Sequence, residues 1–181
     1  MTKPVVLSPT QKALQVNLDS TIYGTFAEIG AGQEVVRHFF RAGGASGTIA
    51  KTMSAYDKDF SDAIYGKEID GRYVSRSRLK KILHQEYGLI EGRLKRKEHP
   101  DKKYFTFANT LATINYSKTV KGHGWMGCRF QTDPNTGYNE VIFHVRLNDN
   151  DAKLLQETIG IMGTNLSDGC FNYYTNPKTL I

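Results

Sequence analysis

The fold is decided by residues 21–41, which read TIYGTFAEIGAGQEVVRHFFR. Residues 21–28 are rich in β-branched and aromatic side chains and run into glycines, a pattern that predicts a strand. Residues 33–41 place apolar side chains at helical spacing, and Gly43 and Gly44 then end the helix. Strand, glycine turn and helix in this order indicate an α/β domain.

Helical signals recur on both sides of the middle of the chain. Residues 48–57 fit either a second strand or the beginning of a helix, and the sequence leaves both open. Residues 77–94 carry one apolar stripe with basic residues beside it, which is typical of an amphipathic helix. Asp151 opens a last helix, because acidic residues favour a helix N-terminus. The residues of this helix that are spaced for burial are Leu155, Ile159, Met162 and Leu166.

The second half of the chain adds three strand-like runs, at residues 104–114, 125–131 and 140–147. Turn residues between the last two runs predict an antiparallel hairpin. In the final run, alternation places Val141, Phe143, Val145 and Leu147 on one face, and Glu140, Ile142, His144 and Arg146 on the other. We therefore predict a mixed sheet of the α/β (α+β) class, with residues 1–20 as an arm and residues 21–181 as one domain.

Composition narrows the class of protein. The chain has 181 residues, 39% of them hydrophobic and 23% charged, as in ordinary globular domains. No apolar run is long enough for a membrane span, and the proline-broken start does not resemble an export signal. Cys128 and Cys170 form no metal-binding or redox motif, and no other His, Cys and carboxylate spacing resembles a ligand set. These features predict a cytoplasmic protein without membrane contact, disulfide or metal, and they leave its oligomeric state open.

The glycine turn after the first strand suits a phosphorylated ligand. Glycines let a backbone approach a phosphate closely, and the N-terminus of the following helix would face it. Acidic side chains at the two strand ends could hold amino or hydroxyl groups, and a second glycine loop adds hydroxyls and a lysine. The candidate ligand-binding residues are Glu28, Gly30, Gly32, Gly43, Gly44, Ser46, Gly47, Thr48, Lys51 and Asp57.

The same segment departs from the standard nucleotide motifs. A dinucleotide fingerprint needs a third glycine near Val35, and Glu34 would bring a negative charge toward a pyrophosphate. Ala45 and Ala50 stand at the two glycine positions of a P-loop ending at Lys51. The alternative is that these glycines only form tight turns and let a helix pack on a strand. The sequence thus indicates a nucleotide or another phosphorylated metabolite as ligand, and no reaction.

Positive charge is concentrated in residues 67–103. Twelve basic and six acidic residues lie there, an excess of six that equals the net charge of +6 of the whole chain. Such a field favours an anionic partner, including nucleic acid, although a basic run can also be a solvated surface. The candidate patch consists of Arg72, Arg76, Arg78, Lys80 and Lys81.

Histidines in the predicted hairpin are the candidates for acid–base chemistry. His123, Glu140 and His144 would share one face if the hairpin forms, with Arg146 as a holder of an anion. An exposed polar face of the sheet is the alternative interpretation.

Residues 26–57, FAEIGAGQEVVRHFFRAGGASGTIAKTMSAYD, resemble the N-terminal signature of a family of larger bacterial proteins. Residues 139–147, NEVIFHVRL, and residues 156–166, QETIGIMGTNL, fit the same family. Its members are labelled TonB-dependent receptor or nicotinate-nucleotide adenylyltransferase. The resemblance implies that this chain is the N-terminal part of a longer protein, and it leaves open whether residues beyond 181 carry the chemistry.

Both labels conflict with the residues. A TonB-dependent receptor needs an export signal, which residues 1–9 do not resemble. Residues 24–26 and 75–79 are similar to two adenylyltransferase motifs, but residues 28–33 lack that family's His-x-Gly-His pair, which stabilises the transferred phosphoryl group.

We therefore expect a cytoplasmic domain that binds a nucleotide or another phosphorylated ligand, and the sequence leaves open whether it is part of a nucleotide-metabolising enzyme. The alternatives are nucleic-acid or polyanion binding through residues 72–103 and an assembly module without chemistry.

Overall fold

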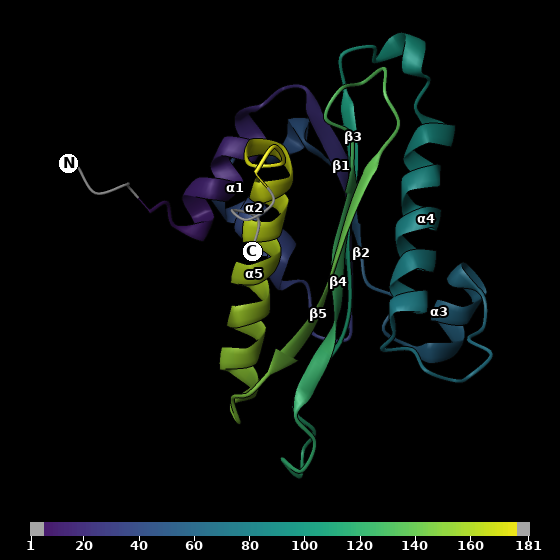
Figure 1. Ribbon diagram of the computed structural model, residues 1–181, viewed down its shortest axis with the longest axis vertical. Coiled ribbons are helices and arrows are strands. Elements are labelled where there is room, and N and C mark those ends of the chain that lie inside the picture. The colour runs from purple at the N-terminus through teal and green to yellow at the C-terminus, as the bar shows by residue number, and fades with distance from the viewer. Residues whose placement is uncertain (1–5, 177–181) are drawn as a thin grey trace.

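A computed structural model describes residues 6–176 of the chain. These residues form a three-layer α/β/α domain with a five-stranded mixed sheet in the middle (Figure 1). The strands are β1 (Ile22–Ile29), β2 (Ile49–Met53), β3 (Lys103–Ala112), β4 (Gly122–Phe130) and β5 (Asn139–Leu147). The helices are α1 (Pro9–Leu18), α2 (Glu34–Ala42), α3 (Lys58–Tyr65), α4 (Arg76–Arg93) and α5 (Ala152–Asn172). Short 3₁₀ turns cover Ala45–Gly47 and Arg96–Glu98.

The strand order is β2-β1-β3-β4-β5. β1 pairs in parallel with both β2 and β3, whereas β3–β4 and β4–β5 are antiparallel. The predicted α/β class and the hairpin of the last two strands are confirmed. Within the ambiguous residues 48–57, Ile49–Met53 form the strand β2, which pairs with β1 from Gly24 to Ala27.

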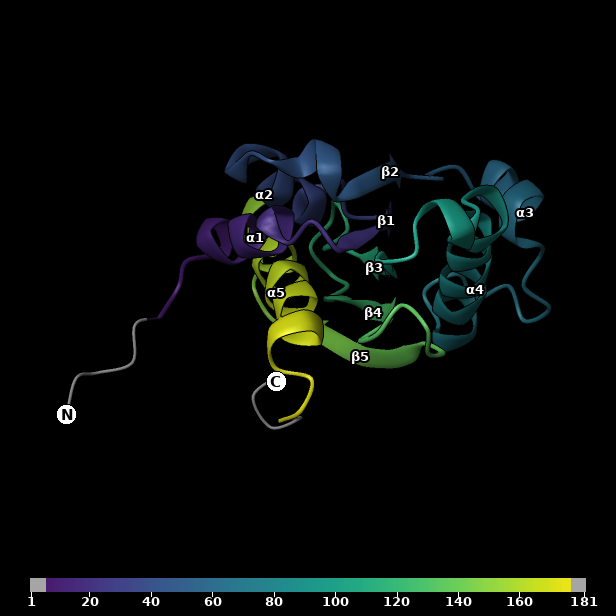
Figure 2. The ribbon, with the colours of Figure 1, turned by 90° about the horizontal axis from the view of Figure 1, so that it is seen from above.

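Helices cover both faces of the sheet. In Figure 2, α1, α2 and α5 lie on one side of the five strands, and α3 and α4 lie on the other. The first side holds the main core, in which Phe26, Phe39 and Phe107 are fully buried with ring centroids of Phe26 at 4.8 and 5.7 Å from the other two. The second side holds a smaller core between α4 and the sheet, around Leu79, Ile82, Leu83 and Ala108.

Alternation in β5 agrees with the predicted faces. Val145 and Leu147 are buried in the main core, and Val141 and Phe143 pack against it. Ile142 packs instead on the α4 side. In α5, Leu155, Ile159 and Leu166 are buried as predicted, but Met162 is 37% exposed. Gly163 lies beside it and takes the close contact with the core that was expected of Met162.

The described part of residues 1–20, which were expected to form an arm or a short preliminary element, contains a helix that packs on the domain. Residues 9–18 form α1, whose start is closed by a capping box between Ser8 and Gln11. Ala13 and Val16 are buried in the main core. The apolar face of α1 is only a few residues wide, which is why periodicity alone did not indicate a helix.

Candidate functional site

The glycine turn after β1 is closed by a side chain of the strand itself. Glu28 is fully buried, and its two carboxylate oxygens accept hydrogen bonds from the backbone N–H groups of Val35 (3.0 Å) and Val36 (2.9 Å). Asn109 donates a third hydrogen bond at 3.4 Å. Burial raises the pKa of the Glu28 carboxyl to about 7. The position at the start of α2 that a ligand's phosphate was expected to take is therefore filled by Glu28.

Backbone geometry explains why glycines occupy this turn. Gly30 and Gly32 have φ values of +100° and +83°, which other residues rarely adopt. A Cβ atom on Gly30 would lie 1.9 Å from the backbone oxygen of Leu111 on β3. The close approach of β1 and β3 therefore requires glycine at this position.

The second glycine loop is likewise built from turns and caps. Gly43 and Gly44 end α2 with φ values of +86° and +71°, and the 3₁₀ turn that contains Ser46 and Gly47 follows. The hydroxyl of Thr48 is buried and donates to the backbone oxygen of Asn17 (3.1 Å).

Asp57 also acts within the chain. Its carboxylate caps α3 by accepting from the backbone N–H of Phe60 at 2.8 Å. β2 ends at Met53, so Asp57 does not stand at the strand end where a ribose was expected to bind.

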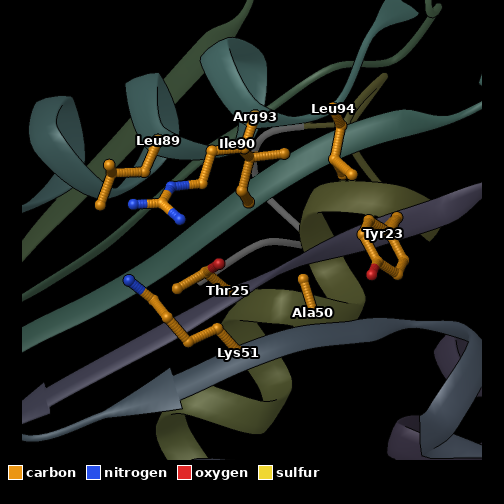
Figure 3. Close-up of a pocket in the computed structure, with 8 residues that line it drawn as sticks. All are labelled: Tyr23, Thr25, Ala50, Lys51, Leu89, Ile90, Arg93 and Leu94. Carbon is orange, nitrogen blue, oxygen red and sulfur yellow. The ribbon is translucent and has the colours of Figure 1, made fainter.

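Lys51 differs from the other members of the predicted set because it lines a cavity. This cavity has a volume of about 410 Å³ and lies between α4 and strands β1 and β2 (Figure 3). Its volume falls in the range of small-molecule sites, roughly 300–1,000 Å³. The lining residues are Tyr23, Thr25, Ala50, Lys51, Leu89, Ile90, Arg93 and Leu94.

The cavity has a cationic side and an apolar side. Figure 3 shows the charged ends of Lys51 and Arg93 on one side of Thr25, and the ring of Tyr23 on the other. Register explains why strand residues meet there, because Thr25 pairs with Lys51 and side chains of paired residues share one face. Leu89, Ile90 and Leu94 of the α4 end form the opposite wall.

A buried carboxylate sets the charge of the cavity. Glu86 is 1% exposed, pairs with Lys51 and accepts a hydrogen bond from the Tyr65 hydroxyl at 2.8 Å. Burial and the Glu86 charge raise the pKa of Tyr65, so this hydroxyl stays a donor. Arg93 forms no ion pair with any residue between 6 and 176. Two cations and one carboxylate leave about one positive charge for a ligand.

The carboxyl ends of the parallel strands are the other place to look for a site. In open α/β sheets, ligands bind where the chain connections leave neighbouring strands in opposite directions, which here is between β1 and β3. A cavity of only about 180 Å³ lies there, and it is lined by Ile29, Ala55, Tyr56, Lys58, Ser61, Tyr73, Arg78 and Thr110.

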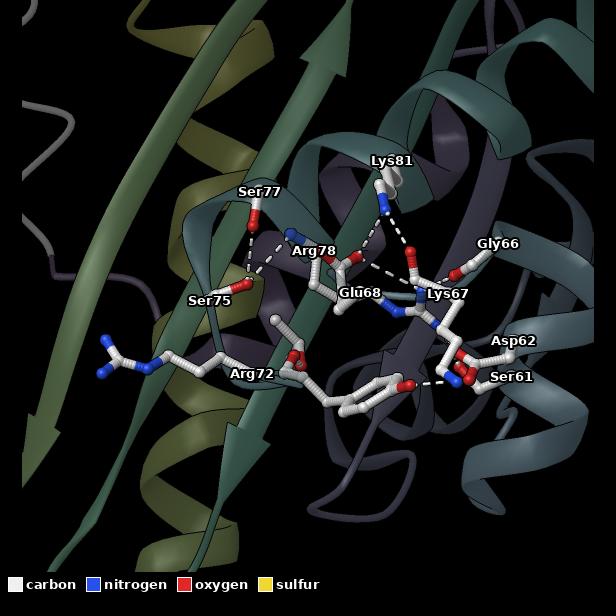
Figure 4. Close-up of polar contacts among 12 residues, drawn as sticks. Ser61, Asp62, Gly66, Lys67, Glu68, Arg72, Ser75, Ser77, Arg78 and Lys81 are labelled. Carbon is white, nitrogen blue, oxygen red and sulfur yellow. Dashed lines mark hydrogen bonds and ion pairs between the residues drawn. The ribbon is translucent and has the colours of Figure 1, made fainter. Parts of the chain in front are cut away.

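Arg78 fills much of this crevice. It is 1% exposed and donates to the Ser61 hydroxyl at 2.7 Å, to the Glu68 carboxylate at 3.3 Å and to the backbone oxygen of Gly66. Its guanidinium carbon also lies 5.0 Å from the centre of the Tyr73 ring. In Figure 4, Ser61, Gly66 and Glu68 lie around the Arg78 side chain. The Arg78 guanidinium is therefore bound by partners within the chain. It is not available to bind a ligand at this end of the sheet.

The predicted basic patch is consequently smaller than expected. Arg78 is buried, so it cannot belong to an exposed basic patch as predicted. Lys81 forms an ion pair with Glu68 at 2.9 Å. Arg72, Arg76 and Lys80 are exposed. Figure 4 shows Arg72 extending away from the network around Arg78.

The candidate acid–base group is divided. Glu140 lies at one end of β5 and is bound by Arg129, with an N–O distance of 2.6 Å. His123 and His144 lie toward the other end, both exposed, with ring centroids 6.2 Å apart. The His144 ring also contacts the Trp125 ring in a tilted arrangement, with centroids 4.7 Å apart. The structure thus brings the two histidines together, but not with Glu140.

The described residues contain neither a cluster of metal ligands nor a membrane-spanning helix. Residues 6–176 contain no group of three or more His, Cys, Asp and Glu side chains that could hold a metal ion. Over the same range, no helix combines the length and the apolar character that crossing a membrane requires.

Sequence reasoning missed Tyr23, Thr25 and Arg93 as site residues. Tyr23 and Thr25 alternate along β1, and this spacing places both on one face of the sheet. Arg93 ends α4, and only the packing of α4 across β1 and β2 brings it near Lys51.

The three-layer α/β/α arrangement around a mixed sheet defines the class of fold, and other proteins of known structure share it. No protein-family model and no curated protein matches this sequence. The competence/damage-inducible protein CihA of Agrobacterium tumefaciens is similar in structure, with a TM-score of 0.59 and 13% identity over 92% of this chain and 97% of that one.

Two enterobacterial structures are similar in the same way. A CinA superfamily protein of Enterobacter cloacae matches with a TM-score of 0.62 and 12% identity over 93% of this chain and 95% of its own. The competence damage-inducible protein A (ComA) of Klebsiella pneumoniae matches with a TM-score of 0.64 and 7% identity over 92% and 96%. At these identities the likeness shows a common fold. It gives no support to the labels TonB-dependent receptor and nicotinate-nucleotide adenylyltransferase.

Proposed function

We propose that this domain binds a small ligand that joins one phosphate or carboxylate group to a ring or another apolar part, as a mononucleotide does. The supporting observation is the cavity between α4, β1 and β2, where Lys51 and Arg93 stand beside otherwise apolar walls. Arginine and lysine side chains hold phosphate oxygens by charge-assisted hydrogen bonds. The glycine turn after β1 does not line this cavity, and it contributes only by allowing β1 to pack closely against β3.

The division of the cavity favours a ligand of mixed character. Thr25 is 1% exposed and lies between the cationic side and the ring of Tyr23. A polar group of a ligand near Thr25 would meet the Thr25 hydroxyl, while the apolar part of the ligand would contact Leu89, Ile90 and Leu94.

A set of matched probes tests the proposal by thermal shift. Adenosine carries the ring, inorganic phosphate carries the charge, and AMP carries both. We expect AMP to raise the melting temperature more than either fragment, because only AMP fills both sides of the cavity. No shift with AMP, NMN or another mononucleotide would contradict the proposal.

A single-stranded oligonucleotide separates the polyanion alternative from this proposal. Binding through a phosphate backbone weakens steeply with salt. Salt-sensitive oligonucleotide binding that depends on Arg72 and Arg76, without a response to AMP, would place function on the basic surface instead.

A further inference from the structure

Strand β5 lies at an edge of the sheet, as Figure 2 shows. It pairs with β4 along all nine of its residues, and no other strand within residues 6–176 pairs with it. Its sequence, NEVIFHVRL, contains no proline or glycine that would interrupt further pairing. An edge of this kind presents a row of free backbone donors and acceptors to another strand.

We propose that β5 pairs in antiparallel fashion with β5 of a second copy of this chain, about a two-fold axis at Phe143. A two-fold axis perpendicular to the sheet keeps each face of β5 continuous with the same face in the second copy. Centred on Phe143, it pairs all nine residues from Asn139 to Leu147. Two five-stranded sheets thereby become one continuous sheet.

Charges on the α4 side of β5 match in this register. Glu140 lies directly opposite Arg146 of the second copy, and the pair occurs twice. Glu140 uses only Oε2 for Arg129, at 3.0 and 2.6 Å, and Oε1 accepts no hydrogen bond within residues 6–176. Arg146 is exposed and has no ion pair in that same range. Each copy therefore offers a free acceptor and a free cation at matching positions.

Neighbouring registers lack this match. An axis at Ile142 would place Glu140 opposite His144, and an axis at His144 would place Ile142 opposite Arg146. Both also leave residues at the strand ends unpaired. Charge and length thus select the same register.

The other face of β5 adds apolar contact. In the register centred on Phe143, Val141 lies opposite Val145 of the second copy. A groove of about 240 Å³ runs between β5 and α5 beside this edge, and Phe143, Val145 and the half-exposed Met162 line it. Association would bring the two grooves together across the axis and remove their apolar side chains from water.

Light scattering of the intact chain tests the association. We expect a dimer whose dissociation constant rises at least tenfold in Arg146→Glu, because that change places two carboxylates opposite each other. Lys80→Glu makes the same charge change on the exposed side of α4, away from β5, and is expected to leave the dimer intact. A monomer at all concentrations, or a dimer equally stable in Arg146→Glu, would overturn the proposal.

A cysteine at the axis tests the register. Phe143 would face its own copy directly, with a Cα–Cα distance of roughly 4.5–5.5 Å, within the range of a disulfide. Phe143→Cys is expected to form a covalent dimer with oxidised glutathione. His144→Cys is more exposed, but its copies would lie diagonally, about 7–8 Å apart or more, and should not cross-link. Folding of both variants is checked by circular dichroism, and cross-linking of folded His144→Cys alone would overturn this register.

Discussion

Glu28 accepts a hydrogen bond from the backbone N–H of Val36 at 2.9 Å, inside the first turn of α2. Glu28 therefore occupies the backbone donors at the start of α2 that a ligand was expected to use. The carboxylate comes from β1, so the bond ties the strand to the helix that follows it. Because Glu28 is fully buried, the stability of the fold depends on the protonation of its carboxyl group.

Stability should therefore depend on pH through Glu28. Its pKa rises from 4.5 to about 7 on folding, so the folded state binds this proton more tightly than the unfolded state. The stabilisation is complete below pH 4.5 and is lost as the pH rises through about 7. The free energy of unfolding of the wild type, measured relative to Glu28→Gln by urea titration, should fall by about 3 kcal/mol across this window. An equal pH dependence in both proteins would contradict the assignment.

Gly163 should not tolerate a side chain. A Cβ atom there would lie 2.3 Å from Val35 and 2.8 Å from Phe107, where α5 crosses the main core. Gly163→Ala is expected to lower the free energy of unfolding by about 1–3 kcal/mol through overpacking. Gly88 of α4 has open space around it, so Gly88→Ala should raise stability by about 0.5–1 kcal/mol. Thermal or urea unfolding of the two variants compares them, and loss of stability in both would show that packing is not the cause.

Arg78 should matter for stability far more than its exposed neighbours. Removing its buried guanidinium leaves Glu68 and the Ser61 hydroxyl without their partner. Arg78→Met is expected to cost about 3–5 kcal/mol, as for other broken buried ion pairs. Lys80→Met, two residues away and exposed, should change stability by less than about 0.5 kcal/mol. A small effect of Arg78→Met would contradict the stabilising role of these buried contacts.

Local patterns predict those parts of the fold that depend on neighbouring residues. The strand–turn–helix unit, the hairpin of β4 and β5 and the alternation around Phe143 all follow from spacing within a few residues. The order β2-β1-β3 does not, because it is set by how α2 and α4 pack on opposite faces. The helix α3 was not predicted, although Asp57 is a typical N-cap residue for it.

The site was harder to predict than the fold. Glu28 has the residue type of a ligand holder, and only the packed start of α2 shows that its partners are Val35 and Val36. Lys51 was identified for its place after a glycine loop, whereas its role in the cavity depends on Arg93 and on the packing of α4. Polar residues that meet across elements cannot be paired from spacing alone.

Calorimetric titration of AMP into the wild type, Arg93→Ala and Lys58→Ala tests the proposed site most directly. Arg93 lines the cavity beside Lys51, whereas Lys58 lines the smaller crevice at the carboxyl ends of the strands. Loss of one charge-assisted contact is expected to weaken AMP binding roughly 10- to 100-fold in Arg93→Ala. Lys58→Ala should bind like the wild type. Binding that survives in Arg93→Ala and is lost in Lys58→Ala would contradict the proposed site and move it to the crevice around Arg78.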